Sequence, residues 1–196
     1  DTRLIIDSTG SVAVRDMLAS LSAKRVPGRL FHAALYEHGK VGMMAIEGPS
    51  RNPVVNDLVI RFWDERIDNP ELATRFSDDS DGLSRQDVGL GCGSHTMVMP
   101  DSRVSLFAAG MAERARHILE NGAPDRGELW IGLLDCHEIG ISWSRVTLGQ
   151  TTVLKIRARN RWEVRILKEP ADQIVQEVED WGDIETGGVL IGRISL

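Results

Sequence analysis

The stretch IIDSTGSVAVRDML (residues 5–18) decides the fold. The apolar run RLIID at residues 3–7 predicts a short buried strand, which the polar residues STGS end. Apolar residues then recur at helical spacing, and Ser11 can cap this helix through its side-chain oxygen. GRLFHAALY at 28–36 and KVGMMAIEG at 40–48 predict the next two strands. The order strand, helix, strand is typical of an α/β fold with a parallel sheet.

The turn after the first strand gathers small polar residues where ligands of doubly wound folds bind, beyond the carboxyl ends of the strands. Free N–H groups at a helix start and small side chains suit a phosphate or a ribose. A plain strand-to-helix turn with a capping serine accounts for the same residues equally well. The residue types alone leave both interpretations open.

Composition limits the classes of function. The 196 residues carry a net charge of −6 with a pI near 5.4, which argues against the basic face that nucleic-acid binding needs. Cys92 and Cys136 are the two cysteines, too few for a disulfide framework and typical of a reducing cytosol. No apolar run approaches ~18 residues, so we expect a cytoplasmic protein without a membrane segment.

The middle of the chain is less regular. Residues 48–90 are polar and rich in turn residues, which predicts loops around one strand, DLVIRFW at 57–63. A long helix is expected over 102–120, capped by Asp101 or Ser102 and ended by an Asn-Gly pair.

The last part of the chain begins a second block. Strand patterns run through 127–157, and the basic turn RARNR then suggests a boundary between residues 1–157 and residues 158–196. The second block contains a strand RWEVRIL, a helix EPADQIVQEVEDW and a strand GGVLIGRISL. We expect the apolar residues of its helix to face inward: Ile174, Val175, Val178 and Trp181.

The segment IIDSTGSVAVRDML resembles the crossover segment of the ThiF/MoeB-type adenylating domain, which belongs to the ubiquitin-activating-enzyme superfamily. The matching residues are Asp7, Thr9, Val12, Ala13, Val14 and Arg15. The resemblance implies a Rossmann-like mixed sheet with flanking helices, a homodimer, and ATP-dependent adenylation of the carboxyl-terminal glycine of a ubiquitin-like or sulfur-carrier protein. It also implies that Asp7, Thr9 and Arg15 belong to the cofactor site.

One position departs from the family pattern. The family's second aspartate of this motif, associated with Mg²⁺ and ATP, falls on Gly10, which has no side chain to bind a metal. Asp7 could compensate, the nucleotide could be held differently, or adenylation could be weakened. The family's glycine-rich phosphate loop would lie upstream of this sequence. We therefore expect the front to be truncated, and we expect this fragment neither to adenylate a carrier nor to bind a cofactor.

Cys92 lies between two glycines in GLGCGSHTMVMPDS, before the long helix and close to His95. Such a thiol is accessible, and a helix start or a protonated histidine would lower its pKa, although a half-buried loop cysteine fits the same residues. Activating-enzyme-like domains of bacteria carry a similar segment, which implies a catalytic thiol that forms a thioester with the carrier. The family's Cys-x-x-Cys pairs are missing, so no structural Zn²⁺ is expected. DCHE at 135–138 is a weak metal motif and is better explained as a strand end.

Glu185 opens the pattern E-x-G-G-x-L-x-G after a strand and a helix. This order resembles the start of a JAB/MPN (JAMM) metalloprotease domain, an α+β fold that would be incomplete here. The resemblance implies that Glu185 is the general base acting on a zinc-bound water. The zinc ligands of that family lie in a later His-x-His-Pro segment that this sequence does not contain. We therefore expect no Zn²⁺ at Glu185 and a chain cut off inside its second domain.

Two other functions stay open at this point. A degenerate adenylation fold, marked by Gly10, could bind a carrier tail or a second copy without catalysis. An ordinary Rossmann oxidoreductase would show a glycine-rich turn followed by an acidic ribose ligand, and no such fingerprint is visible. The preferred hypothesis is an activating enzyme fused to a JAB-type zinc isopeptidase, with a carrier protein and a conjugating enzyme as partners, and with neither nucleic acid nor membrane.

Overall fold

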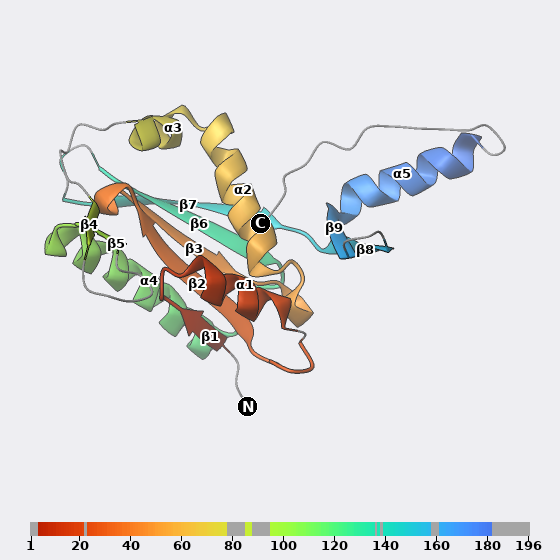
Figure 1. Ribbon diagram of the computed structural model, residues 1–196, viewed down its shortest axis with the longest axis horizontal. Helices are drawn as coiled ribbons and strands as arrows, with labels where there is room; N and C mark the ends of the chain where they lie inside the picture. Colours follow the sequence, from red (N-terminus) through yellow and green to blue (C-terminus); the bar gives the residue numbers. More distant parts are fainter. Residues whose placement is uncertain are drawn as a thin grey trace. The chain divides into compact units, whose positions relative to one another are not determined.

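The computed structural model describes residues 4–21, 23–77, 85–87, 95–135, 137, 139–157 and 161–181. The contacts between residues divide the chain into two compact units, Asp1–Leu148 and Gly149–Leu196. Unit 1 is a mixed α/β unit built on one five-stranded sheet (Figure 1). The described residues of unit 2 form a strand pair and one helix.

The sheet of unit 1 mixes parallel and antiparallel neighbours. Its order is β1 (Leu4–Asp7), β2 (Arg29–Tyr36), β3 (Val41–Ile46), β6 (Gly127–Leu134) and β7 (Ile141–Leu148). β1 and β2 run parallel, with α1 (Val12–Ser20) as the connection between them, and every other neighbouring pair is antiparallel. This confirms the predicted strand–helix–strand unit and a mixed α/β sheet, while the parallel arrangement that this order favours is limited to β1 and β2. β4 (Arg85–Asp87) and β5 (His95–Met97) form a separate short antiparallel pair.

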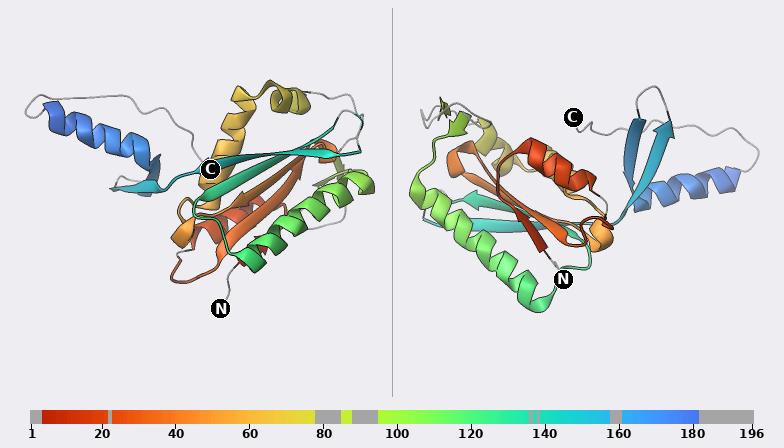
Figure 2. Two further views of the ribbon diagram at one scale, coloured as in Figure 1. Left: turned by 180° about the vertical axis from the view of Figure 1, so that it is seen from behind. Right: turned by 60° about the horizontal axis from the view of Figure 1, so that its bottom comes forward.

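Apolar side chains alternate between the two sides of the central strands, so both faces of the sheet are apolar. Helices cover both faces. The first face packs against α1, α2 (Val55–Asp68) and α3 (Pro70–Ser77), and the second against α4 (Asp101–Asn121) (Figure 2). The first face carries the larger core: Leu30, Val41, Met43, Ala45, Leu129, Ile131 and Leu133 from the strands, with Val55, Leu58, Val59, Phe62 and Leu72 from the helices. The second carries Phe31, Met44, Ile46, Ala115 and Ile118.

The strand predicted at 57–63 is wrong: these residues lie in α2. A second helix, α3, follows it within the segment 48–90, where loops were predicted on both sides of that strand. The buried residues of α2 recur at spacings of three and four, so that one stripe of the helix faces the core: Val55, Leu58, Val59 and Phe62. Tertiary packing of that stripe outweighs the strand preference of a short apolar run.

The long helix predicted over 102–120 is confirmed as α4, and it ends at Gly122, whose φ is +93°. The cap predicted at Asp101 or Ser102 is wrong. Pro100 occupies the N-cap position without a side-chain hydrogen bond, and Asp101 lies in the first turn. A carboxylate there still favours the helix, since it faces the positive end of the helix dipole.

Glu47 and Arg51 form a buried polar cluster where β3 ends. Glu47 is fully buried, and its oxygens accept from the backbone N–H groups of Leu30 at 3.0 Å and Val55 at 3.1 Å and from the guanidinium of Arg51, whose Nε lies at 2.6 Å. Arg51 also donates to the carbonyls of Leu18 and Leu21, both at 2.7 Å, at the end of α1. These hydrogen bonds join β2, α1 and α2 to the end of β3.

In unit 2 the structure describes the antiparallel pair β8 (Thr151–Arg157) and β9 (Arg161–Leu167), followed by α5 (Lys168–Trp181). These three elements confirm the strand and helix patterns predicted there. The unit begins before β8, whereas the boundary expected after residue 157 falls between two strands that pair with each other. The last predicted strand, GGVLIGRISL, lies outside the described residues.

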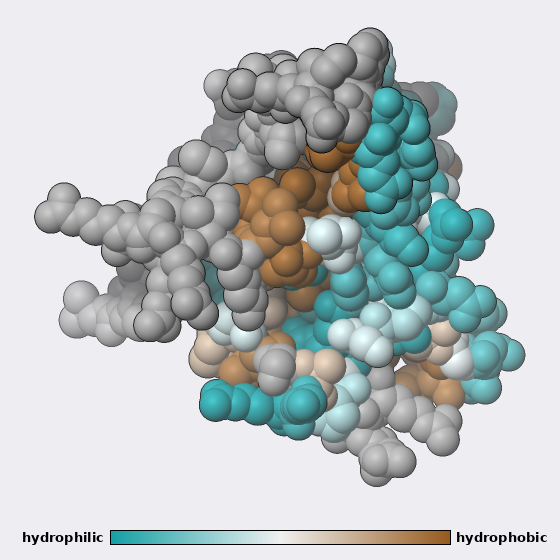
Figure 3. All heavy atoms as spheres, turned by 90° about the vertical axis from the view of Figure 1, so that its right-hand side faces the viewer, coloured by the Kyte–Doolittle hydropathy of each residue, from teal (hydrophilic) through white to brown (hydrophobic). Residues whose placement is uncertain are grey.

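The apolar stripe of α5 does not face inward as expected. Ile174, Val175 and Val178 are 40%, 55% and 52% exposed, because no described part of unit 2 covers that side of the helix. Figure 3 colours one face of the molecule by hydropathy, and hydrophobic side chains, in brown, reach the surface there. In the part of the chain that the structure describes, no helix is long and apolar enough to cross a bilayer.

Candidate functional site

The turn after β1 is held by its own side chains. The backbone N–H and the hydroxyl of Thr9 both donate to Oδ1 of Asp7, at 3.1 and 2.8 Å. Ser11 accepts from the N–H of Val14 at 3.4 Å and is the N-cap of α1, as predicted. Gly10 lies between them with φ at +66°, a left-handed conformation that glycine adopts without strain. These contacts fix the entry of α1 directly beyond the end of β1.

Asp7 is paired with a histidine from the neighbouring strand. Parallel pairing of β1 with β2 sets Asp7 opposite His32, and Oδ2 of Asp7 lies 2.9 Å from Nδ1 of His32. Their side chains are only 1% and 4% exposed. Burial works against ionisation of Asp7, but the hydrogen bonds from Thr9 and His32 outweigh it and lower its pKa. Asp7 is therefore a carboxylate, and Nδ1 of His32 is the nitrogen that carries the proton toward it.

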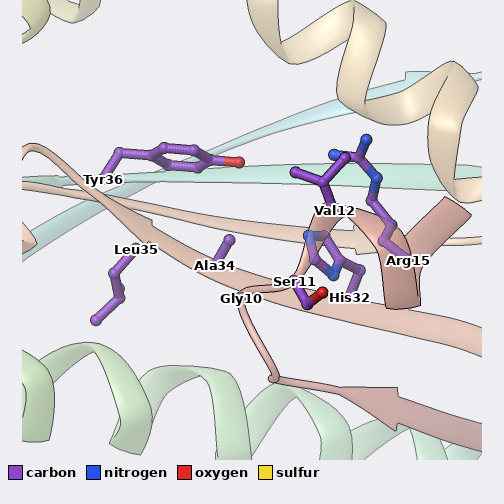
Figure 4. Close-up of a pocket in the computed structure, with 8 residues that line it drawn as sticks. All are labelled: Gly10, Ser11, Val12, Arg15, His32, Ala34, Leu35 and Tyr36. Atoms are coloured by element: carbon purple, nitrogen blue, oxygen red, sulfur yellow. The ribbon is translucent and has the colours of Figure 1, made fainter. Parts of the chain in front are cut away.

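A pocket of about 130 Å³ opens beside this pair. It lies along β2 and under the first turn of α1, and it is lined by Gly10, Ser11, Val12, Arg15, His32, Ala34, Leu35 and Tyr36. Figure 4 shows His32 beside Ser11, with Val12 and Arg15 on the same side, Ala34 in the middle and Tyr36 at the far end, while Leu35 points away from the others. Two small residues, Gly10 and Ala34, leave the room that the pocket occupies.

The pocket offers one basic nitrogen and several donors. Burial lowers the pKa of His32, an effect that Asp7 partly offsets, so the imidazole is neutral near pH 7 and its Nε2 is an acceptor. Burial raises the pKa of Tyr36, which keeps its phenol protonated. The first N–H groups of α1 have no partner within the helix and favour negative charge. Arg15 adds a positive charge, held by Asp16 at 2.9 Å.

The predicted site residues fall into two groups. Arg15 lines the pocket, while Asp7 and Thr9 lie next to it in the turn, where they hold each other and His32. Cys92 and Glu185 lie outside the described residues. Asp7 and Thr9 in the turn and Arg15 on α1 thus lie around one pocket, and the roles predicted for all five residues stay predictions.

Mg²⁺ and ATP fit this turn unequally. The start of α1 and Arg15 suit a phosphate or carboxylate group. Both oxygens of Asp7 are already taken by Thr9 and His32, and Gly10 offers no side chain. The turn therefore offers Mg²⁺ only a carboxylate whose two oxygens already accept hydrogen bonds, which makes it a poor magnesium site by itself.

His32 and Tyr36 are the pocket residues that the sequence did not reveal. Both lie within the predicted strand 28–36, where they look like ordinary members of an apolar run. The available signal was their spacing: His32, Ala34 and Tyr36 alternate onto one face of β2, the face that α1 covers. Their partner Asp7 could be assigned only once the register of β1 against β2 was known.

Among the described residues, no group of three or more His, Cys, Asp or Glu side chains is arranged to hold a metal ion. No protein-family model matches the sequence, and no curated protein matches it either. What the chain does is therefore inferred from the pocket and from the sequence motifs.

Proposed function

We propose that the chain is part of an enzyme that activates the carboxyl terminus of a ubiquitin-like or sulfur-carrier protein, followed by the first part of a JAB-type zinc isopeptidase domain. In this proposal unit 1 is the carboxyl-terminal part of a Rossmann-like ThiF-type adenylating domain. Its pocket holds the end of the carrier, where ATP and Mg²⁺ supply the activating chemistry in the complete enzyme. The expected assembly is a homodimer.

One observation carries the proposal: the pocket beyond β1 and under the start of α1 combines a small lining with groups that attract an anion. A carrier ending in glycine has a carboxylate and no side chain near its end, so a pocket bounded by Gly10 and Ala34 suits it in size. The start of α1 and Arg15 suit its negative charge. The motif at residues 5–18 supports the same activity independently, through its resemblance to activating enzymes.

ATP–pyrophosphate exchange in the full-length protein tests this function. Exchange that depends on a carrier ending in glycine is the expected result, and removal of the last glycine from the carrier should abolish it. Arg15→Ala should weaken carrier-dependent exchange, whereas Arg116→Ala, at an exposed position on α4, should leave it unchanged. No exchange with any carrier would contradict the proposal.

A second function is favoured by the geometry of the turn itself. Because Gly10 has no side chain and both oxygens of Asp7 are engaged, the domain could bind a carrier tail or a second copy without adenylating it. Binding of the carrier by isothermal calorimetry with no exchange would favour this docking function.

The two predicted residues outside the described part have their own tests in the full-length protein. Cys92→Ala should abolish a thioester to the carrier, and an undiminished adduct that dithiothreitol releases would contradict that role. Glu185→Gln should abolish isopeptidase cleavage and leave zinc bound, as measured by metal analysis. Cleavage at the normal rate would assign the base to another residue.

A further inference from the structure

We infer that His32 is the proton acceptor of the pocket: its Nε2 takes the proton from the thiol, amine or water that attacks an activated carboxyl carbon bound there. This inference rests on the proposed function, which supplies the activated carboxyl group. It assigns a reacting role to a residue that no sequence motif singled out.

Asp7 fixes the orientation of the His32 ring through Nδ1. Oδ2 of Asp7 lies 2.9 Å from Nδ1, and Oδ1 is held by both donors of Thr9, so the carboxylate cannot turn away. A carboxylate accepts and never donates, which sets the proton on Nδ1 and leaves the lone pair on Nε2. The same logic orients the histidine of hydrolytic triads, although no triad is implied here.

His32 borders the pocket, although its side chain as a whole is only 4% exposed. His32 lines the pocket, and its Nε2 has no hydrogen-bond partner among the described residues. Gly10 and Ala34 leave room for a small group against it. The start of α1 and Arg15 can stabilise the negative charge that develops on the carboxyl oxygen during attack. A base and an anion-stabilising region thus border one small space.

The proposed step balances without an oxidant or a reductant. The attacking sulfur, nitrogen or oxygen forms a bond to the carboxyl carbon and passes its proton to Nε2. The bond between that carbon and the oxygen of its phosphate leaving group breaks, and the leaving group departs with the electron pair. The imidazolium that forms is stabilised by Asp7 and later returns its proton to solvent.

Four charged or titratable groups face His32 from the elements around it: Asp7 on β1, Arg15 and Asp16 on α1, and Tyr36 on β2. Asp7 and Asp16 favour the imidazolium, while Arg15 and burial disfavour it. Their balance keeps the ring neutral and basic near pH 7, the state a proton acceptor needs.

The test measures transfer separately from activation, in the full-length protein. The carrier is first activated, and its single-turnover transfer to water, an acceptor that does not itself titrate in this range, is then followed between pH 5 and pH 8. In the unaltered protein the rate should rise with pH through the titration of His32. His32→Asn keeps a donor toward Asp7 and removes the base, so transfer should slow by about 100-fold or more and lose this dependence. His117→Asn, on the exposed side of α4, is the matched control.

Three outcomes are distinguishable. Slow, pH-independent transfer by His32→Asn, with a folded protein by circular dichroism, supports the inference. Undiminished transfer with the normal pH profile overturns it while the proposed function stands. Absence of ATP–pyrophosphate exchange in the unaltered protein overturns the proposed function and with it the reaction assigned to His32.

A second measurement guards against a variant that fails to fold. Nitrogen-15 NMR of the unaltered chain should show the proton of His32 on Nδ1. In Asp7→Asn the single amide oxygen cannot serve both Thr9 and His32, so the proton should move to Nε2. Such a protein should fold and transfer slowly, as expected of a positioning residue. A proton on Nε2 in the unaltered chain would overturn the inference.

Discussion

Two buried carboxylates on the same face of the fold have opposite surroundings. Glu47 is closed on all sides: its oxygens meet Leu30, Val55 and Arg51, and Arg51 in turn meets α1. Asp7 holds a histidine whose far nitrogen borders a pocket. Burial and pairing are thus common to both, and only the second cluster has an atom left for a ligand. The comparison separates a carboxylate that stabilises the fold from one that prepares a site.

The closed cluster should show the largest effect on stability. Arg51→Ala leaves the carboxylate of Glu47 buried without its cation, which should cost about 3–5 kcal/mol of the free energy of unfolding. Urea denaturation of this chain measures it. Arg116→Ala, which removes exposed ion pairs to Glu113 and Glu120, should leave the midpoint unchanged. An equal loss in both variants would show that burial does not distinguish the two sites.

Asp7→Asn should cost less, about 1–3 kcal/mol, because the amide oxygen still accepts from Thr9 and its NH₂ group can donate to His32 once the histidine proton has moved, so that only the charge of the carboxylate is lost. The same urea titration measures this loss. A cost as large as that of Arg51→Ala would mean that the Asp7 cluster is as closed as the Glu47 cluster.

The open cluster should also make stability depend on pH. The pKa of folded His32 is lowered, so as pH falls below about 6.5 the unfolded chain binds a proton before the folded chain does. Stability is therefore complete above pH 7 and is lost toward the lower pKa of the folded state, by at most about 1.4 kcal/mol per pH unit. His32→Asn should remove this slope between pH 7 and 5.5, and His117→Asn should retain it. Identical slopes in the three proteins would contradict the assignment.

Substitution at Gly10 should have the smallest effect on stability. A Cβ there meets no atom within 4 Å, and asparagine and aspartate tolerate a positive φ better than other residues. Gly10→Asn and Gly10→Asp should each cost about 1 kcal/mol or less by thermal unfolding. If the turn lacks only a metal ligand, Gly10→Asp in the full-length protein should raise Mg²⁺-dependent ATP–pyrophosphate exchange above that of Gly10→Asn. Equal exchange in the two variants would show that a carboxylate at this position does not help.

The sequence predicted the elements whose pattern is local. The strands at 28–36 and 40–48 and the helix at 102–120 have runs long enough to be recognised, and the cap at Ser11 follows from one residue type. The helix α2 was missed although its buried residues repeat at three and four, because the apolar cluster in DLVIRFW dominated the pattern. The polar residues on both sides of this cluster are typical of loops.

The site was predictable only in part. Asp7, Thr9 and Arg15 lie close together in sequence, and the motif that joins them was visible. The pairing of β1 with β2 places His32 beside Asp7, and a local sequence pattern does not determine the register of two strands that lie far apart in the chain. For the same reason the closed cluster of Glu47 and Arg51 went unnoticed, since its other partners lie on three separate elements.

The antiparallel pairing of β3 with β6 has a consequence for how unit 1 assembles. Ile46 lies opposite Glu128, although α2, α3 and α4 all come between them along the chain. The hairpins β2–β3 and β6–β7 need only short loops and can form early, whereas joining them closes a long loop against chain entropy. We therefore expect the pairing of β3 with β6 to be the slow step in folding. Mutations of residues that pair across β3 and β6 should slow refolding more than mutations within either hairpin.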